Sequence, residues 1–190
     1  DGKNSQLREL AGIQTTIRDY HQTAIVCTIA HEKSHHGLAQ ERFLPAGPFA
    51  VLPMTEQRSS LVWVEPSDRA QLYIDLPKEE CEQEISERVG GYLGKITLAG
   101  DRFAYPLSFS YAKQCVSGRV GLIGDAAHAI HPIAGQGVNL GYKDVAVLLD
   151  LLQKWRAGDM DVAQLLAQYQ RWRRFDNVTM LATMHGLNQL

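Results

Sequence analysis

The amino-acid sequence predicts an α+β protein, in which an antiparallel sheet is followed by a strand–loop–helix unit of the α/β type. Runs rich in β-branched and aromatic residues alternate with polar or proline-containing turns over residues 20–111, which is typical of antiparallel strands. Over residues 119–157 a short apolar run leads into an acidic turn, a glycine-rich loop and a long helical pattern.

Composition and charge limit the possible function classes. The 190 residues are 45% hydrophobic and 21% charged, as in ordinary globular proteins, and the net charge is −2. Because there is no basic run, no nucleic-acid partner is expected. No apolar stretch reaches the ~20 residues that a membrane-spanning helix needs. The three scattered cysteines, Cys27, Cys81 and Cys115, suit a reducing compartment.

The first residues predict a polar turn and one short helix. Ser5 is placed to cap a helix over residues 6–11, and Gly12 is placed to end it. The sheet follows, and prolines between its runs place some strands at an edge. The predicted strands cover residues 20–30, 41–44, 49–53, 60–64, 95–105 and 107–111.

Aromatic side chains in these runs could fill the core or line an apolar pocket, and core positions are favoured for most of them. They are Phe43, Phe49, Trp63, Phe103, Tyr105 and Phe109. A helix is predicted within this region, over residues 77–93, because its apolar residues recur every four positions. This stripe consists of Cys81, Ile85, Val89 and Leu93. The charged residues off the stripe, Glu82, Glu84, Glu87 and Arg88, are interpreted as solvated surface rather than as a catalytic carboxylate pair.

Residues 31–35 match H-E-x-x-H, the zinc-peptidase pattern. That pattern binds zinc only when its two histidines lie one helical turn apart on one face. Here His31 follows a β-rich run and His35 precedes His36-Gly37, so a polar turn and no metal site are predicted.

Two helices are predicted near the end of the chain. The first begins near Asn139 and ends at Gly158, and the second is capped by Asp159 or Asp161. The buried side of the second helix is expected to carry Val162, Leu165, Leu166, Tyr169 and Trp172. Its arginines, Arg171, Arg173 and Arg174, are expected to face water, with Asp176 as a partner for one of them.

The rest of the chain is organised around residues 119–144. The run from Val120 to Ile123 predicts a buried strand that ends at Gly124-Asp125, where a carboxylate can accept hydrogen bonds from ligand hydroxyls. The glycines at 135 and 137 let a ligand approach the backbone. The helix that follows directs free N–H groups and partial positive charge toward such a ligand. The pattern predicts a ligand site.

This segment resembles the second FAD-binding motif of flavin-dependent aromatic hydroxylases, and its sequence HPIAGQGVNLG is close to that of the ubiquinone-biosynthesis hydroxylases within that family. Residues 93–97 and 104–107, together with 41–43, 47–48 and 52–54, resemble the substrate domain of one branch, the 2-polyprenyl-6-methoxyphenol hydroxylases. The resemblance implies that Asp125 binds the ribityl chain, that the proline and glycine loop lie beside the isoalloxazine, and that the helix start faces its pyrimidine edge. The positions it assigns to the cofactor here are Gly124, Asp125, Pro132, Gly135, Gln136, Gly137, Val138 and Asn139.

The beginning of the chain is similar to a further motif of this family, Asp-Gly-x-x-Ser-x-x-Arg, whose positions are occupied by Asp1, Gly2, Ser5 and Arg8. Asp1 and Arg8 are therefore also assigned to the cofactor. The resemblance implies a fragment of a p-hydroxybenzoate-hydroxylase-like FAD monooxygenase. Residues 1–14 and 117–190 would belong to the FAD domain and residues 15–116 to the substrate domain. The sequence contains no GxGxxG, so the half that binds the ADP part of FAD is expected upstream.

The resemblance also implies an activity: NAD(P)H reduces FAD, O2 reacts with the reduced cofactor, and a polyprenylated methoxyphenol of ubiquinone biosynthesis is hydroxylated. This chain alone is expected to bind FAD weakly or not at all and to be inactive. A cytoplasmic location is expected, with other ubiquinone-biosynthesis enzymes and the inner-membrane surface as further partners.

No catalytic residue is assigned. His128 and His131 lie in this segment, and histidine is the residue type that can act as a base near neutral pH, but structural histidines bonded to backbone are favoured over a base. Two other interpretations stay open. A different flavoprotein, of the halogenase or prenyl-reductase type, could share the Gly-Asp motif. Alternatively, a non-catalytic module could hold a prenylated lipid or a partner enzyme.

Overall fold

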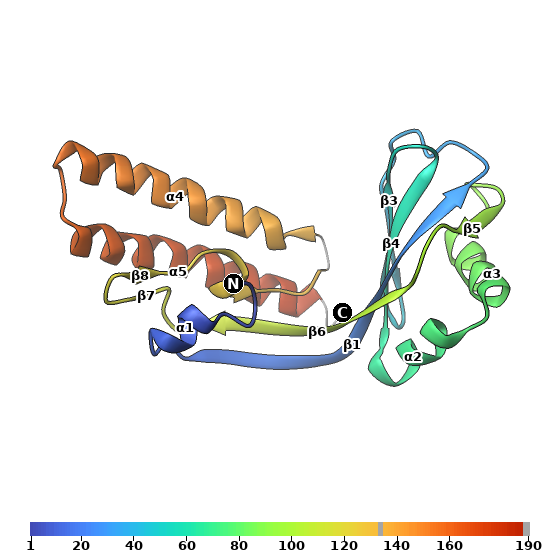
Figure 1. Ribbon diagram of the computed structural model, residues 1–190, viewed down its shortest axis with the longest axis horizontal. Coiled ribbons are helices and arrows are strands. Elements are labelled where there is room, and N and C mark those ends of the chain that lie inside the picture. The colour runs from blue at the N-terminus through green and yellow to red at the C-terminus, as the bar shows by residue number, and fades with distance from the viewer. Residues whose placement is uncertain (133–134, 188–190) are drawn as a thin grey trace. The chain divides into compact units, whose positions relative to one another are not determined.

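A computed structural model describes residues 1–132 and 135–187 and shows an α+β protein, as predicted (Figure 1). The chain forms two compact units. We call residues 21–107 the sheet unit, and residues 1–20 together with those from 108 onward the motif unit. Strands β1 (Thr15–His31) and β6 (Phe103–Ala112) contribute residues to both units.

The sheet unit is built on an antiparallel meander, as the alternation of apolar runs and turns predicted. Its strands follow the order β2-β3-β4-β1, and β5 also pairs with β1. The register places Trp63 opposite both Ile25 and Phe49, and all three side chains are buried. The strands not yet named are β2 (Gln40–Leu44), β3 (Gly47–Pro53), β4 (Arg58–Pro66) and β5 (Ile96–Leu98).

Two helices cover one face of this sheet, α2 (Ser67–Asp75) and α3 (Lys78–Val89) (Figure 1). The predicted stripe of α3 is confirmed, because Cys81, Ile85, Val89 and Leu93 are all at most 1% exposed. The helix ends at Val89 rather than Leu93, since Gly90 takes the left-handed conformation (φ +81°) that terminates helices. Helix α2 was not predicted.

The charged residues of α3 differ from the prediction. The Arg88 guanidinium lies 4.3 Å from the centre of the Trp63 ring and also contacts Glu84, so this side chain is largely buried rather than solvated. Glu82 is also partly buried, and its carboxylate accepts a hydrogen bond from the Leu98 N–H (2.7 Å). The long arginine side chain covers an aromatic face, which charge patterning along a helix does not reveal.

The predicted aromatic core is confirmed only in part. Phe49 and Trp63 are buried, whereas Phe43, Phe103 and Tyr105 are each more than half exposed. The boundaries of the later strands also differ from the prediction. Strand β5 has only three residues, and β6 runs without interruption through Pro106, because the φ of proline is compatible with an extended backbone.

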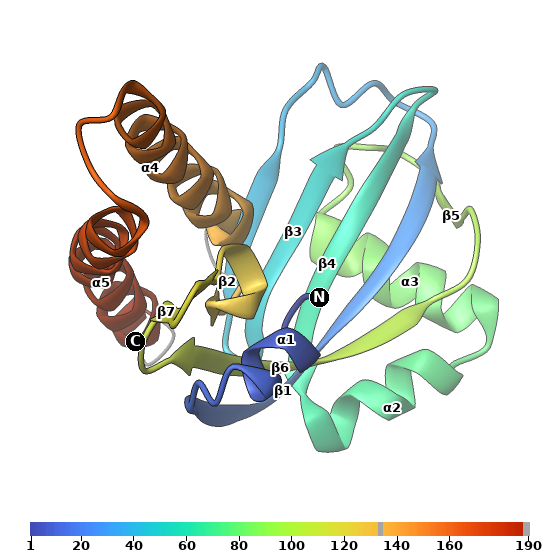
Figure 2. The ribbon, with the colours of Figure 1, turned by 60° about the vertical axis from the view of Figure 1, so that its left-hand side comes forward.

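The motif unit contains the helical pair α4 (Gly137–Ala157) and α5 (Val162–Leu187), which lie side by side in both views (Figures 1 and 2). Asp161 caps α5, since its carboxylate accepts from Gln164 N (2.8 Å) while Gln164 Oε1 accepts from Asp161 N (2.9 Å). Leu165, Leu166 and Tyr169 are buried as predicted, but Val162 and Trp172 are both more than a third exposed.

The remaining elements of the motif unit are short. Ser5 caps α1 as predicted, because its hydroxyl accepts from Arg8 N (3.1 Å). The predicted buried strand over residues 120–123 was wrong: only Leu122 is buried, because β8 pairs with β7 alone among the described strands. These elements are α1 (Gln6–Leu10), β7 (Val116–Ser117), β8 (Val120–Gly121), the 3-10 turn η1 (Gly124–Ala126) and β9 (His128–Ala129).

None of the helices within the described residues combines the length and apolar character that crossing a membrane requires. The outward face of α4 carries exposed apolar side chains: Val138, Tyr142, Val145, Leu149, Leu152 and Trp155. All three cysteines are buried and reduced.

Candidate functional site

The turn η1 presents one acidic side chain to solvent. Gly124 adopts a left-handed conformation (φ +57°), which a residue with a Cβ rarely takes. Asp125 follows it and is exposed. Within the part of the chain that the structure describes, its carboxylate has no hydrogen-bond or ion-pair partner. An ionised carboxylate with free acceptor oxygens can bind ligand hydroxyls.

The backbone on both sides of Asp125 is fixed. Gly124 N–H donates to Asp144 Oδ2 (2.8 Å), and the Gly124 carbonyl accepts from Ala127 N (2.8 Å). Arg8 Nη1 donates to the Ala126 carbonyl (2.9 Å). The turn is therefore held from α1 and from α4.

Asp1 and Arg8, the other predicted cofactor residues, are both engaged with protein atoms. The buried Arg8 also donates through Nη2 to the Lys3 carbonyl (2.9 Å). The Asp1 carboxylate accepts from Ser5 Oγ (2.7 Å) and from Leu7 N (3.1 Å). These contacts bring the first residues of the chain to the turn, and a direct cofactor contact by either residue stays a prediction.

The start of α4 lies beside the same turn. A Cβ on Gly141 would lie 3.6 Å from Gly124 Cα, so the second turn of α4 packs closely on η1. The helix begins after Gln136 without a side-chain cap, and its first turn carries no acidic residue. The first N–H groups of the helix therefore have no intrahelical acceptor and favour negative charge.

The loop before α4 is only partly described. Gly135 N–H donates to the Pro132 carbonyl (2.8 Å), and Gly135 is left-handed (φ +60°). Asn139 Nδ2 donates to Gln136 Oε1 (3.2 Å), and Val138 is exposed. Residues 133 and 134 of the predicted motif lie outside the described residues.

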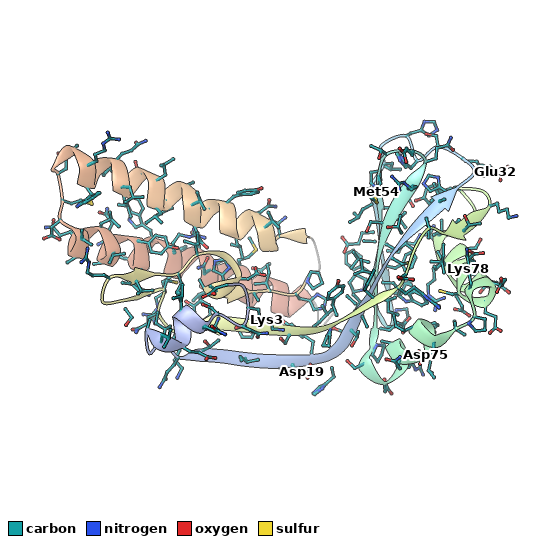
Figure 3. All side chains as sticks on the ribbon, in the orientation of Figure 1. Lys3, Asp19, Glu32, Met54, Asp75 and Lys78 are labelled. Carbon is teal, nitrogen blue, oxygen red and sulfur yellow. The ribbon has the colours of Figure 1, made fainter. Side chains whose placement is uncertain are left out.

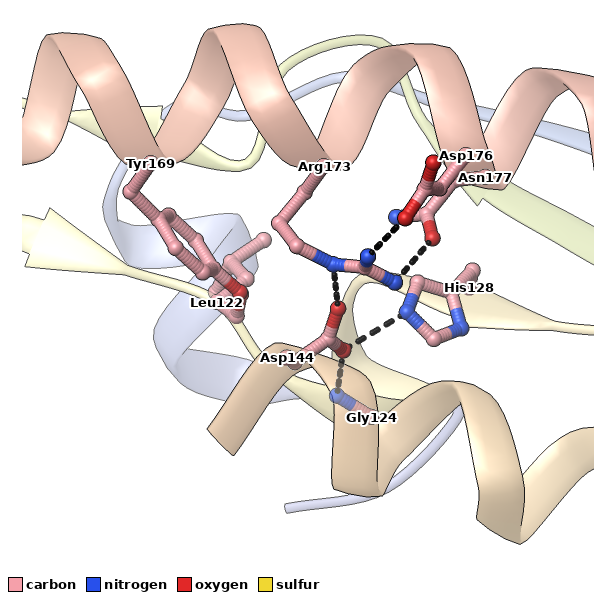
Figure 4. Close-up of polar contacts among 8 residues, drawn as sticks. All are labelled: Leu122, Gly124, His128, Asp144, Tyr169, Arg173, Asp176 and Asn177. Carbon is pink, nitrogen blue, oxygen red and sulfur yellow. Dashed lines mark hydrogen bonds and ion pairs between the residues drawn. The ribbon is translucent and has the colours of Figure 1, made fainter. Parts of the chain in front are cut away.

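Behind the turn lies a buried polar network that the sequence did not predict (Figure 4). Asp144 Oδ2 also accepts from His128 Nε2 (2.7 Å), and Oδ1 accepts from Arg173 Nε (2.6 Å). Arg173 is 1% exposed, so the prediction that it faces water was wrong. Its Nη1 and Nη2 donate to Asp176 (2.7 Å) and Asn177 (2.9 Å), which confirms the predicted pairing with Asp176.

The pKa of Asp144 reflects two opposing causes. Burial alone would raise this pKa, but the hydrogen bond and charge of His128, together with bonds from Arg173 and Gly124 N, lower it below its ordinary value. Asp144 is therefore ionised at neutral pH and can only accept hydrogen bonds, so His128 Nε2 carries a proton.

Neither histidine of the motif is accessible to a ligand in solution. His128 and His131 are 2% and 1% exposed. The predicted backbone bond of His128 is replaced by the side-chain bond to Asp144. The His131 ring lies edge-on to Tyr20, with ring centroids 4.9 Å apart, and burial lowers the pKa of His131 to about 4.

This lowered pKa predicts an acid-sensitive motif unit. Below pH ~6.5 the unfolded chain protonates His131, whereas the folded protein resists protonation down to about pH 4. The free energy of unfolding should therefore fall by up to ~3 kcal/mol as the pH falls through this window. In His131→Asn, urea unfolding across the window should show a flatter pH dependence. The control is His36→Asn at an exposed histidine. If the free energy of unfolding depends on pH as steeply in His131→Asn as in the natural protein, the lowered pKa of His131 is contradicted.

The H-E-x-x-H match forms a turn, as predicted, with Glu32 in the loop that follows β1 (Figure 3). His31 Nδ1 donates to the Lys33 carbonyl (2.7 Å), and its Nε2 is 3.1 Å from Ser59 Oγ. His35 Nε2 bonds to the Met54 carbonyl (2.8 Å). Among residues 1–132 and 135–187, no group of histidine, cysteine and acidic side chains is arranged to hold a metal ion.

Comparison with known proteins identifies the family of the site. The family model described as "FAD binding domain" matches residues 1–181, which include η1, α4 and most of α5. The chain belongs to the FAD-binding domain family. The sequence features that predicted this family were Gly124-Asp125 and the glycine loop.

Several relatives of this FAD-binding domain protein carry the names of ubiquinone hydroxylases. It is 50% identical to "Ubiquinone hydroxylase UbiL" of Rhodospirillum rubrum over 100% of this chain and 45% of that protein. It is 39% identical to "3-demethoxyubiquinol 3-hydroxylase" of Escherichia coli over 83% of this chain and 40% of that protein. The chain thus spans less than half the length of these relatives.

A solved structure supports the fold. The probable FAD-dependent monooxygenase PqsL of Pseudomonas aeruginosa superposes with a TM-score of 0.85 over 100% of this chain and 54% of that one, at 24% identity. At this identity the likeness shows a shared fold alone.

Proposed function

We propose that this chain supplies the flavin-facing part of an FAD-dependent aromatic-ring monooxygenase, and that the whole protein hydroxylates a polyprenylated phenol in ubiquinone biosynthesis. The observation that carries the proposal is the exposed carboxylate of Asp125, which has no partner among the described residues and follows Gly124, where the turn lies against Gly141 of the uncapped helix α4. The names of the relatives support the substrate class.

The groups at this site suit the flavin half of FAD. The Asp125 carboxylate accepts hydrogen bonds from ribityl hydroxyls. The N–H groups at Gly137 and Val138 provide partial positive charge for an electron-rich ring edge. Left-handed Gly135 keeps the loop free of side-chain bulk.

When bound, FAD supplies the redox and oxygen chemistry. The protein residues bind and orient it: Asp125 fixes the ribityl chain, and the start of α4 stabilises negative charge on the ring. NAD(P)H as reductant and contact with the inner-membrane surface from a cytoplasmic location are further parts of the proposal. The reductant follows from the resemblance to flavin-dependent aromatic hydroxylases, and the membrane contact rests on the chemistry of a lipid substrate.

The test is FAD binding and turnover by this chain and by a form extended upstream with its natural coding sequence. The extended form should retain FAD and oxidise NAD(P)H in a phenol-dependent reaction that incorporates oxygen from O2. This chain alone should bind FAD weakly or not at all. Incorporation of halide instead would favour the halogenase interpretation, and lipid binding without flavin would favour the binding module.

The substitution Asp125→Asn should weaken FAD binding by the extended form roughly 10–100-fold, because hydrogen bonds from hydroxyls to a charged carboxylate are replaced by weaker ones. Fluorescence titration measures the Kd. Exposed Asp159, in the loop between α4 and α5, gives a matched control in Asp159→Asn. An unchanged Kd in Asp125→Asn would remove this carboxylate from the site.

A further inference from the structure

Asp144, a buried residue, holds the turn that carries the exposed Asp125. It is 0% exposed on α4, and its carboxylate accepts from three donors on three elements (Figure 4). Oδ2 accepts from Gly124 N and His128 Nε2, and Oδ1 accepts from Arg173 Nε. One point on α4 therefore ties together η1, β9 and α5.

A buried ion pair is not needed to stabilise this core. Apolar side chains of similar volume often stabilise a core as well or better, and Leu151, two turns further along α4, does so at 0% exposure. A carboxylate differs from leucine because its donors must approach along defined directions. The hydrogen bonds of Asp144 therefore indicate that this residue fixes the geometry of the backbone around it.

The geometry that it controls is that of the turn. Gly124 is left-handed, and its Cα lies beside Gly141 of α4, where even an added Cβ would be in van der Waals contact with it. The Ala126 carbonyl is held by Arg8 on the other side. Asp125 lies between these two fixed points, with its carboxylate outside and unpaired within the described part of the chain.

We propose that Asp144 is a positioning residue for the flavin site. Its hydrogen bond to Gly124 N fixes the turn so that the Asp125 carboxylate is oriented for a ribityl hydroxyl. The inference rests on the proposed function, because Asp125 is the group through which Asp144 acts. Asp144 itself does not touch the cofactor.

The first test measures the turn without flavin, by amide hydrogen exchange on the longer natural protein. In Asp144→Asn the carbonyl oxygen should turn to the charged donor Arg173, since hydrogen bonds to charged groups are the stronger ones. The amide NH2 then faces Gly124 N, which loses its acceptor. Exchange at residues 124–126, relative to amides of the α4–α5 core, should rise about tenfold.

The control is Leu151→Ala, which lowers stability in the same helix without touching the turn. It should leave the relative exchange of the turn unchanged. If Asp144→Asn fails to fold, the double variant Asp144→Leu/Arg173→Leu removes the acceptor without leaving a buried unpaired charge. Unchanged exchange at the turn in the variant that folds overturns the inference.

The second test is a double-mutant cycle on FAD affinity. Asp144→Asn should raise the Kd for FAD about tenfold in the natural background but less than twofold when Asp125→Asn is already present. Equal effects in both backgrounds would show a role in stability alone and overturn the inference. If the natural protein binds no FAD, the proposed function fails and the flavin role falls with it. Amide hydrogen exchange at the turn then still reports whether Asp144 holds the Gly124 N–H.

Discussion

Replacing Arg173 with methionine is expected to lower the free energy of unfolding by about 3–5 kcal/mol. Arg173 is the charge partner of buried Asp144, so its loss leaves an ionised carboxylate in the core without compensation. Asp176 and Asn177 also lose their donor. Urea unfolding of the variant and the natural protein gives the difference.

The neighbouring Arg174 provides a matched control, because it lies on the same helix and is exposed. Arg174→Met should change the free energy of unfolding by no more than about 0.5 kcal/mol. A loss below about 1 kcal/mol in Arg173→Met would mean that Asp144 finds another partner or is protonated in the folded protein.

Ile85→Ala is expected to cost about 2–5 kcal/mol in the sheet unit. Ile85 is 0% exposed at the centre of the α3 stripe, so its truncation leaves a cavity against the sheet. Leu72→Ala is the control, since Leu72 is 66% exposed on α2 and alanine suits a helix. Equal losses in the two variants would argue against a packed α3–sheet core.

The features that the sequence predicted well are those with local signals. The four-residue spacing of Cys81, Ile85 and Val89 identified the buried side of α3. Short polar motifs identified the cap Ser5 and narrowed the cap of α5 to Asp159 or Asp161, of which the structure shows Asp161. The Gly124-Asp125 turn and the glycine loop were recognisable because their residue types and order are specific. Helix α2 was missed because its apolar stripe is short: only Ala70 is buried, and Tyr73 and Ile74 are partly buried against the core.

The features that the sequence did not reveal depend on contacts between distant residues. Arg173 lies in a run of charges typical of a solvated surface, and its partner Asp144 precedes it by 29 residues. Arg88 is covered by Trp63 from another element. No pattern within one helix indicates such pairing, so the buried network behind the candidate site became visible only in three dimensions.

The three buried cysteines give each unit its own chemical reporter. Burial raises the pKa of Cys27 to about 12 and that of Cys115 to about 11, so little reactive thiolate forms near neutral pH. Cys27 and Cys81 lie in the sheet unit, and Cys115 lies in the motif unit. Pulsed alkylation followed by peptide mass spectrometry can therefore time the opening of each unit separately, in one sample and without an introduced label.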